Sequence, residues 1–162
     1  MTVLALRQPR AYLVRETAVS MAINAALSAL FVFLMFGGKD HVGLWGFDGL
    51  ALDFLPQTFI IAFMASLVPS ALARQALKKG KVSGPAGQAT ILPKNLFVRS
   101  LVIAASVSVV AIPLAVLIIA LASSGSLRFA TLLLLKIAYG AGVACVVTSF
   151  AIRAVLSEGV GA

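Results

Sequence analysis

One lysine, Lys136, lies inside a long apolar run, LLLLKIAYGAGVAC, and its position needs a chemical reason. An ammonium group costs free energy in hydrocarbon unless it reaches water, a polar partner or an opposite charge. The sequence leaves two arrangements open. The side chain could extend along its aliphatic stem to the lipid head groups, or it could pair with an acid from another part of the chain.

Three of the five acidic residues lie in a single stretch, GGKDHVGLWGFDGLALDFLPQ. They are Asp40, Asp48 and Asp53, and the last two are the candidate partners of Lys136. We expect Asp53 to cap the helix that begins near it, because a carboxylate is stabilised at the positive end of a helix. One histidine, His41, among acids on a glycine-rich segment makes a poor metal site. We therefore expect no metal and no cofactor.

The motif Arg-x-x-Leu-x-x-Gly occurs at Arg74 and again at Arg153, near the ends of two apolar runs. If the motif marks a duplication, aligning its two copies places Gln57 opposite Lys136, and Asp53, Gln57 and Lys136 form one polar cluster. The alternative is that helix ends commonly carry arginine followed by glycine. The sequence leaves both explanations open.

We interpret four polar residues in or directly beside the apolar runs as candidates for a substrate or ion pathway: Lys136, Gln57, Asp53 and Asn24. A different role is expected for Ala138, Gly142 and Cys145, whose small side chains would let another helix approach closely. We interpret these three as a helix interface. No nucleophile, base and acid occur together by type and spacing, so we do not expect an enzyme.

The composition shows which solvent surrounds these residues. Hydrophobic residues make up 61% of the 162 residues and charged residues 11%, against about 45–50% and about 25% in an ordinary globular domain. The mean hydropathy is +1.08. A chain this short cannot bury so much apolar surface inside itself, so we expect it to be embedded in a lipid bilayer.

Four segments are long enough to cross a bilayer, at roughly 17–36, 55–77, 97–122 and 128–156. Crossing takes about 20 apolar residues in a helix, and lone strands would leave backbone groups unpaired in lipid. We predict an all-α integral membrane protein with four transmembrane helices in a single membrane domain, 1–162. Two tandem helical hairpins, 17–77 and 97–156, joined by a linker at 78–96, are one possible organisation of that domain.

The basic residues predict the orientation. Ten of the 13 lie in the two termini and the middle connection: Arg7, Arg10, Arg15, Arg74, Lys78, Lys79, Lys81, Lys94, Arg99 and Arg153. Because cytoplasmic segments are enriched in Lys and Arg, both termini are predicted to be cytoplasmic, in a bacterial inner membrane. The same rule explains the net charge of +8 without a nucleic-acid partner.

Two functions fit these features. The first is a small transporter or channel-like protein of unknown substrate, oligomeric because four short spans leave little room for a path within one chain. The second is a structural or accessory subunit of a larger membrane complex. The expected partners are accordingly lipid and either further copies of the chain or another membrane protein.

Overall fold

Four long helices make up most of the chain that the structure describes, as the sequence predicts. The computed structural model describes residues 9–46, 49–84, 91–123 and 125–158. The helices are α1 (Pro9–Phe36), α2 (Leu50–Lys78), α3 (Leu96–Ala122) and α4 (Phe129–Glu158). Each is long and apolar enough to cross a membrane, which suggests a membrane protein.

Two helices begin well before the apolar segments that indicated them. Helix α1 starts at Pro9 instead of near residue 17. Proline suits a first helical position, and basic residues can continue a helix beyond its apolar part. Helix α2 starts at Leu50, after Gly49, which makes no side-chain cap. Asp53 therefore lies in the first turn of α2 and not at its cap position, so the expectation that it caps this helix is wrong, whereas the expectation that its carboxylate meets the positive end of the helix is confirmed.

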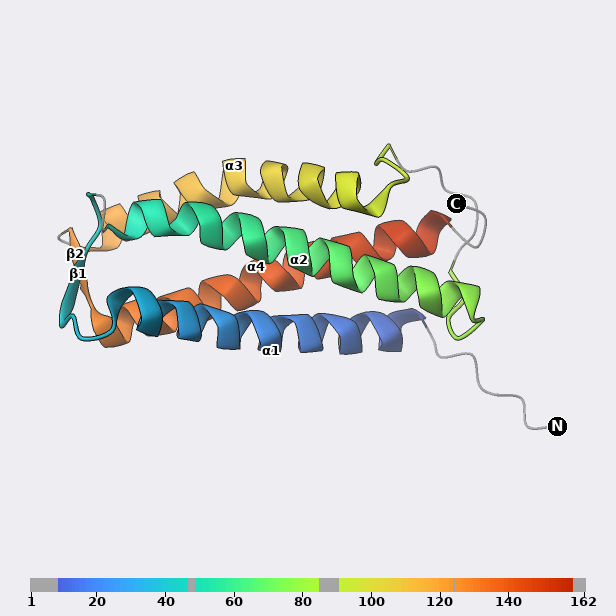
Figure 1. Ribbon diagram of the computed structural model, residues 1–162, viewed down its shortest axis with the longest axis horizontal. Helices are drawn as coiled ribbons and strands as arrows, with labels where there is room; N and C mark the ends of the chain where they lie inside the picture. The colour runs from blue at the N-terminus through green and yellow to red at the C-terminus, as the bar shows by residue number, and fades with distance from the viewer. Residues whose placement is uncertain (1–8, 47–48, 85–90, 124, 159–162) are drawn as a thin grey trace.

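Helices α2 and α4 lie side by side at the centre of the bundle, with α1 packed on α4 and α3 packed on α2 (Figure 1). The consecutive helices α1 and α2 touch little. The chain thus does not close into two compact hairpins of neighbouring helices. That the two halves arose by duplication stays a prediction.

The bundle places small side chains between its helices and large apolar ones on its outside. Buried positions include Ala62, Ala65, Ala104, Ala144 and Ala151, whereas many leucine, valine and phenylalanine side chains are exposed. This distribution is typical of helices that pack in lipid, where close backbone approach matters more than hiding apolar surface.

A short β-ribbon, which the sequence did not indicate, ties the two connections at one end of the bundle. Strand β1 (His41–Gly43) pairs antiparallel with β2 (Ser126–Arg128), with Val42 opposite Leu127. Val42 is buried and belongs to an apolar cluster at this end of the bundle, together with Phe36 of α1. The ribbon therefore fixes the start of α4 relative to the end of α1, and Lys136 follows two turns later.

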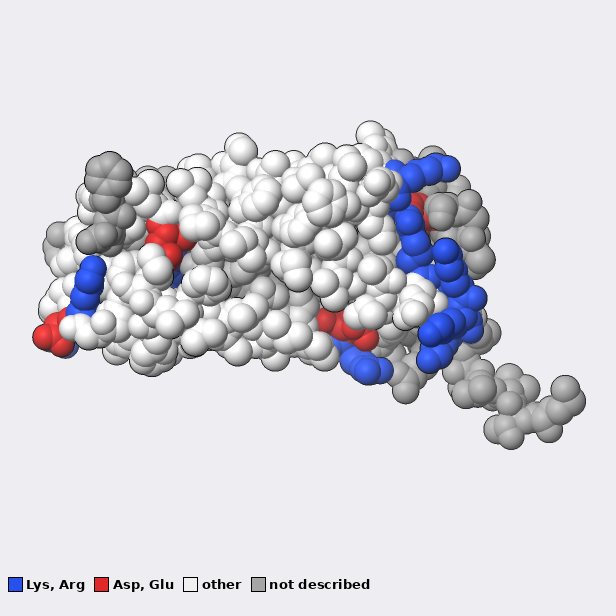
Figure 2. Space-filling view, viewed as in Figure 1, with Lys and Arg blue, Asp and Glu red and all other residues white. Residues whose placement is uncertain are grey.

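The opposite end carries most of the positive charge. Figure 2 shows Lys and Arg side chains gathered where α1 begins, α2 ends and α4 ends, beside a broad white surface. We call this the basic end, and the other the ribbon end. The described basic residues thus gather mainly at one end of the bundle (Figure 2), as the sequence pattern predicts. The side of the membrane on which that end lies stays a prediction.

Candidate functional site

Lys136 is completely buried and is held by three side chains of α2. Its Nζ donates to Asp53 Oδ2 at 2.5 Å and to Gln57 Oε1, and it lies 3.8 Å from the centre of the Phe54 ring. Its exposed fraction is 0%. The structure therefore shows the paired arrangement of Lys136 rather than extension to the head groups. Asp48, the other candidate acid, lies outside the described residues.

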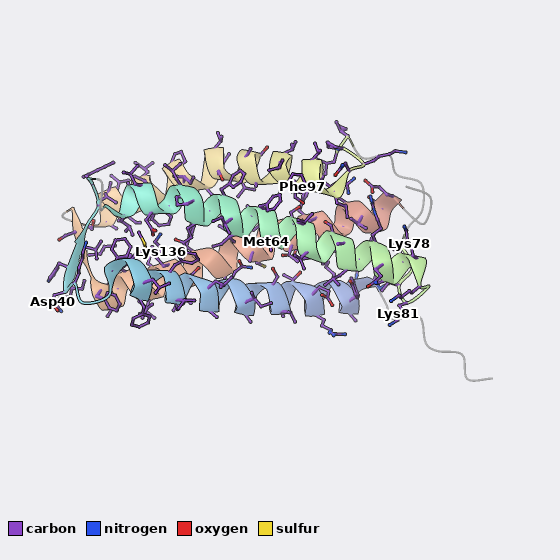
Figure 3. The ribbon with its side chains drawn as sticks, in the orientation of Figure 1. Asp40, Met64, Lys78, Lys81, Phe97 and Lys136 are labelled. Carbon is purple, nitrogen blue, oxygen red and sulfur yellow. The ribbon has the colours of Figure 1, made fainter. Side chains whose placement is uncertain are left out.

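The spacing of these α2 residues explains how one helix supplies all three contacts. Positions 53 and 57 are one turn apart on the same face, and Phe54 adjoins Asp53 in the chain. Figure 3 shows Lys136 in the part of the bundle nearer the ribbon end, far from Lys78 and Lys81 at the basic end. The carboxylate, the amide oxygen and the aromatic face together supply the partners that a buried ammonium needs.

Gln57 connects this cluster to α1. Its Nε2 donates to Ser28 Oγ at 3.1 Å, so its two amide atoms bridge Lys136 on α4 and Ser28 on α1. Gly140, one turn beyond Lys136, lets α1 come this close: a Cβ atom there would lie 2.1 Å from Ser28 Oγ and 3.2 Å from the Asn24 carbonyl oxygen. We call Lys136, Asp53, Gln57 and Ser28 the ribbon-end cluster.

Further polar residues, all buried except the half-buried Ser149, continue from this cluster toward the basic end. Asn24 donates to the Ser20 carbonyl oxygen at 2.8 Å, and Thr148 donates to Ser20 Oγ at 2.8 Å. Beyond them the hydroxyl groups of Thr17 and Ser149 lie 3.3 Å apart. We call Asn24, Ser20, Thr148, Thr17 and Ser149 the polar seam.

Sequence reasoning found Asn24 but missed the rest of the seam. The signal was present in the first apolar run, where polar residues recur at 17, 20, 24 and 28, the spacing of one helix face. Thr148 and Ser149 gave no such signal, because they form a single polar pair among apolar residues of α4 and are not repeated at helical spacing.

A hollow of about 450 Å³ opens beside the cluster at the ribbon end. It is lined by Met35, Phe36, Lys39, Gly49, Leu52, Asp53 and Pro56. Asp53 thus belongs both to the buried pair and to the wall of the hollow, and 13% of its side chain is exposed. The carboxylate is the part of the ribbon-end cluster that a ligand in the hollow would meet.

A second buried ion pair lies at the basic end and was not foreseen. Arg99 of α3, whose side chain is 0% exposed, donates to Glu158 Oε1 of α4. Arg99 Nε also donates to the Pro93 carbonyl oxygen at 3.0 Å. Arg74 of α2 places its Nη2 3.7 Å from Glu158 Oε2, so two arginines share one carboxylate. We call Arg99, Glu158 and Arg74 the basic-end cluster.

The predicted helix interface lies on the outside of α4. Ala138 and Gly142 are exposed and Cys145 is half-buried, and a Cβ atom at Gly142 would meet no atom within 4 Å. The face of α4 that packs inside the chain carries Lys136, Gly140 and Ala144 instead. An interface through Ala138, Gly142 and Cys145 to another chain stays a prediction.

Acids and histidines do not assemble into a metal site in the described part of the chain, where no group of three His, Cys, Asp or Glu residues is close enough to hold an ion. His41 and Asp40 instead lie at the start of the β-ribbon, with the Asp40 carbonyl oxygen accepting from Phe129 N at 3.0 Å. No protein-family model matches the chain, and no curated protein or solved structure does either.

Proposed function

We propose that this chain is an integral protein of a bacterial inner membrane, with both termini cytoplasmic, and that it transports a small solute or ion as an oligomer. The observation that carries the proposal is the buried Lys136–Asp53 pair with the polar seam beyond it. Charged residues inside membrane spans are costly and are usually placed where they serve a solute or proton pathway.

The arrangement supports transport because its parts follow one another along the bundle. The hollow exposes Asp53 at the ribbon end. Lys136 and Gln57 lie behind it, and the seam supplies hydroxyl and amide groups toward the basic end. Helix packing alone is served by small side chains and by hydrogen bonds between helices, and it does not require a full ion pair next to an open hollow.

Accessibility of engineered cysteines tests the path without knowledge of the substrate. In a Cys145→Ala background, Ser28→Cys and Ser20→Cys place a thiol in the cluster and in the seam. Leu134→Cys is the matched control, because Leu134 is 69% exposed on the outer surface of α4. We expect a small, charged, membrane-impermeant thiol reagent to modify both path positions and to leave Leu134→Cys unmodified. Path thiols that stay as unreactive as the control would contradict the proposal.

Labelling from one side of the membrane tests the orientation. Ser83→Cys lies in the connection between α2 and α3, and Ser126→Cys lies in the ribbon. With both termini cytoplasmic, reagent outside intact cells labels position 126 and not position 83. The reverse pattern would contradict the orientation that the basic residues predict.

The accessory-subunit function rests on a different observation, the exposed small-residue face of α4 around Gly142. Gly142→Leu would block close approach of another helix there. Crosslinking in detergent separates the two functions: loss of a homo-oligomer supports the transporter, and loss of a different protein that purifies with the chain supports the accessory subunit. Unchanged assembly removes this face from both.

A further inference from the structure

The hollow at the ribbon end combines an apolar wall with two opposite charges. It lies between the end of α1 and the start of α2, two helices that touch little. Its apolar residues include Met35 and Leu52, which are 57% and 45% exposed. Because neighbouring positions of α1 and α2 carry other exposed large apolar residues, among them Leu34 and Leu55, the wall of the hollow adjoins the apolar surface that would contact lipid.

The two charges come from Asp53 and Lys39. The Asp53 carboxylate binds Lys136 through Oδ2 and still lines the hollow. Lys39 follows α1, with its backbone N donating to the Phe36 carbonyl oxygen at 3.1 Å. Its ammonium lies 5.8 Å from the Phe36 ring and makes no ion pair with an acid in the described residues. Lys39 is therefore available to an anionic group.

The two walls favour a ligand with two kinds of polar group. Lys39 can pair with an anionic group, and the exposed part of the Asp53 carboxylate, whose charge Lys136 already balances, can still accept hydrogen bonds from an ammonium group. A metal cation would find only one carboxylate where several oxygen ligands are needed. A molecule that carries both charges can satisfy both walls at once. An apolar wall that opens onto the lipid-facing surface further favours a zwitterion with hydrocarbon chains.

We propose that the hollow binds one zwitterionic phospholipid from the leaflet at the ribbon end. Its ammonium group lies against Asp53, its phosphate lies against Lys39, and its acyl chains run along the exposed apolar faces of α1 and α2. A volume of about 450 Å³ is within the usual range of about 300–1,000 Å³ for ligand pockets. This inference goes beyond transport and does not depend on it.

Native mass spectrometry of the full chain tests the proposal, with phosphatidylethanolamine and phosphatidylglycerol added in equal amounts. We expect one phosphatidylethanolamine to be retained preferentially. Lys39→Gln should weaken that binding roughly tenfold, because a charge-assisted hydrogen bond to the phosphate is lost. Arg128→Gln is the matched control, since it removes an exposed cation of β2 at the same end, and it should leave lipid binding unchanged.

Three results would overturn the proposal. One is equal retention of the two lipids, which would indicate a site without a carboxylate contact. Another is unchanged binding in Lys39→Gln. The third is competition by soluble phosphoethanolamine at the same concentration as the lipid, which would indicate a site for a soluble zwitterion rather than for a lipid. A failure of the thiol-accessibility test above would leave these outcomes unaffected.

Discussion

The two buried ion pairs in the described part of the chain differ in charge balance and in the partners that surround them. At the ribbon end one ammonium meets one carboxylate, and Gln57 and Phe54 complete the shell around Lys136. At the basic end two arginines share Glu158, and the Pro93 carbonyl oxygen also accepts from Arg99. The first cluster is neutral, while the second keeps a surplus positive charge.

This difference suggests different roles. The basic-end cluster joins the ends of α2 and α4 to the start of α3, beside a concentration of cations (Figure 2). We infer that this cluster holds the helix ends together. The ribbon-end cluster lies within the apolar length of α2 and α4. A neutral ion pair costs less free energy in such an environment than an unpaired charge. The position of the ribbon-end cluster beside an open hollow is the observation that supports the proposed transport function.

The largest predicted effect comes from removing the carboxylate of the ribbon-end cluster. Asp53→Asn leaves Lys136, which is fully buried, without an opposite charge, and should cost about 3 kcal/mol of stability. Lys136→Met should cost less, about 1–2 kcal/mol, because the Asp53 that remains can be hydrated from the hollow. Thermal unfolding in detergent measures both variants, and an equal or reversed order would contradict the burial difference between the two side chains.

A smaller effect is predicted where α1 meets α4 beside that cluster. Gly140→Val should cost about 2 kcal/mol, because its side chain would collide with Ser28 and with the Asn24 carbonyl oxygen. Gly142→Val is the matched control, two residues away on the open side of α4, and should leave the stability of the single chain nearly unchanged. Equal unfolding temperatures for the two variants would show that α1 does not approach α4 at Gly140.

The basic-end cluster should tolerate the loss of its acid better than the ribbon end does. Glu158→Gln is expected to cost about 2 kcal/mol: Arg99 is as fully buried as Lys136, but its guanidinium charge is delocalised and more weakly hydrated than an ammonium, and it keeps the Pro93 carbonyl oxygen as a partner. The same thermal unfolding experiment measures it. A loss larger than that of Asp53→Asn would reverse the comparison between the two ends.

The smallest effect is predicted for Arg74→Gln, at about 0.5 kcal/mol. The Arg74 side chain is 25% exposed and lies 3.7 Å from Glu158, and exposed ion pairs contribute little. Raising the salt concentration should shift the unfolding temperature of the native chain by a similarly small amount. If the unfolding temperature depended strongly on salt in the native chain but not in Arg74→Gln, this arginine would be an essential part of the basic-end cluster.

The helices and the charge distribution could be predicted from the sequence because both depend on composition over many residues. Four apolar runs and the grouping of Lys and Arg needed no knowledge of packing. The association of Lys136 with Gln57 was suggested by aligning the motifs at Arg74 and Arg153. The choice of Asp53 over Asp48, and of pairing over extension to the head groups, required knowing which faces of α2 and α4 meet.

Other features depended on contacts that no local pattern encodes. The β-ribbon involves three residues on each side, too few to give an alternating pattern, and its strands are far apart in the chain. The Arg99–Glu158 pair joins the start of α3 to the end of α4, and Arg99 looked like an ordinary boundary arginine. The hollow exists because α1 and α2 diverge, which depends on both helices packing elsewhere.

The double-mutant cycle of Lys136→Met and Asp53→Asn tests most directly that the two charges form a coupled buried pair. The chain is compared as wild type, each single variant and the double variant, by thermal unfolding in detergent. We predict a coupling energy of at least about 1 kcal/mol, so that the double variant is more stable than the sum of the single losses allows. Coupling near zero would mean that Lys136 and Asp53 do not depend on each other, and the pair at the centre of the proposed path would be rejected.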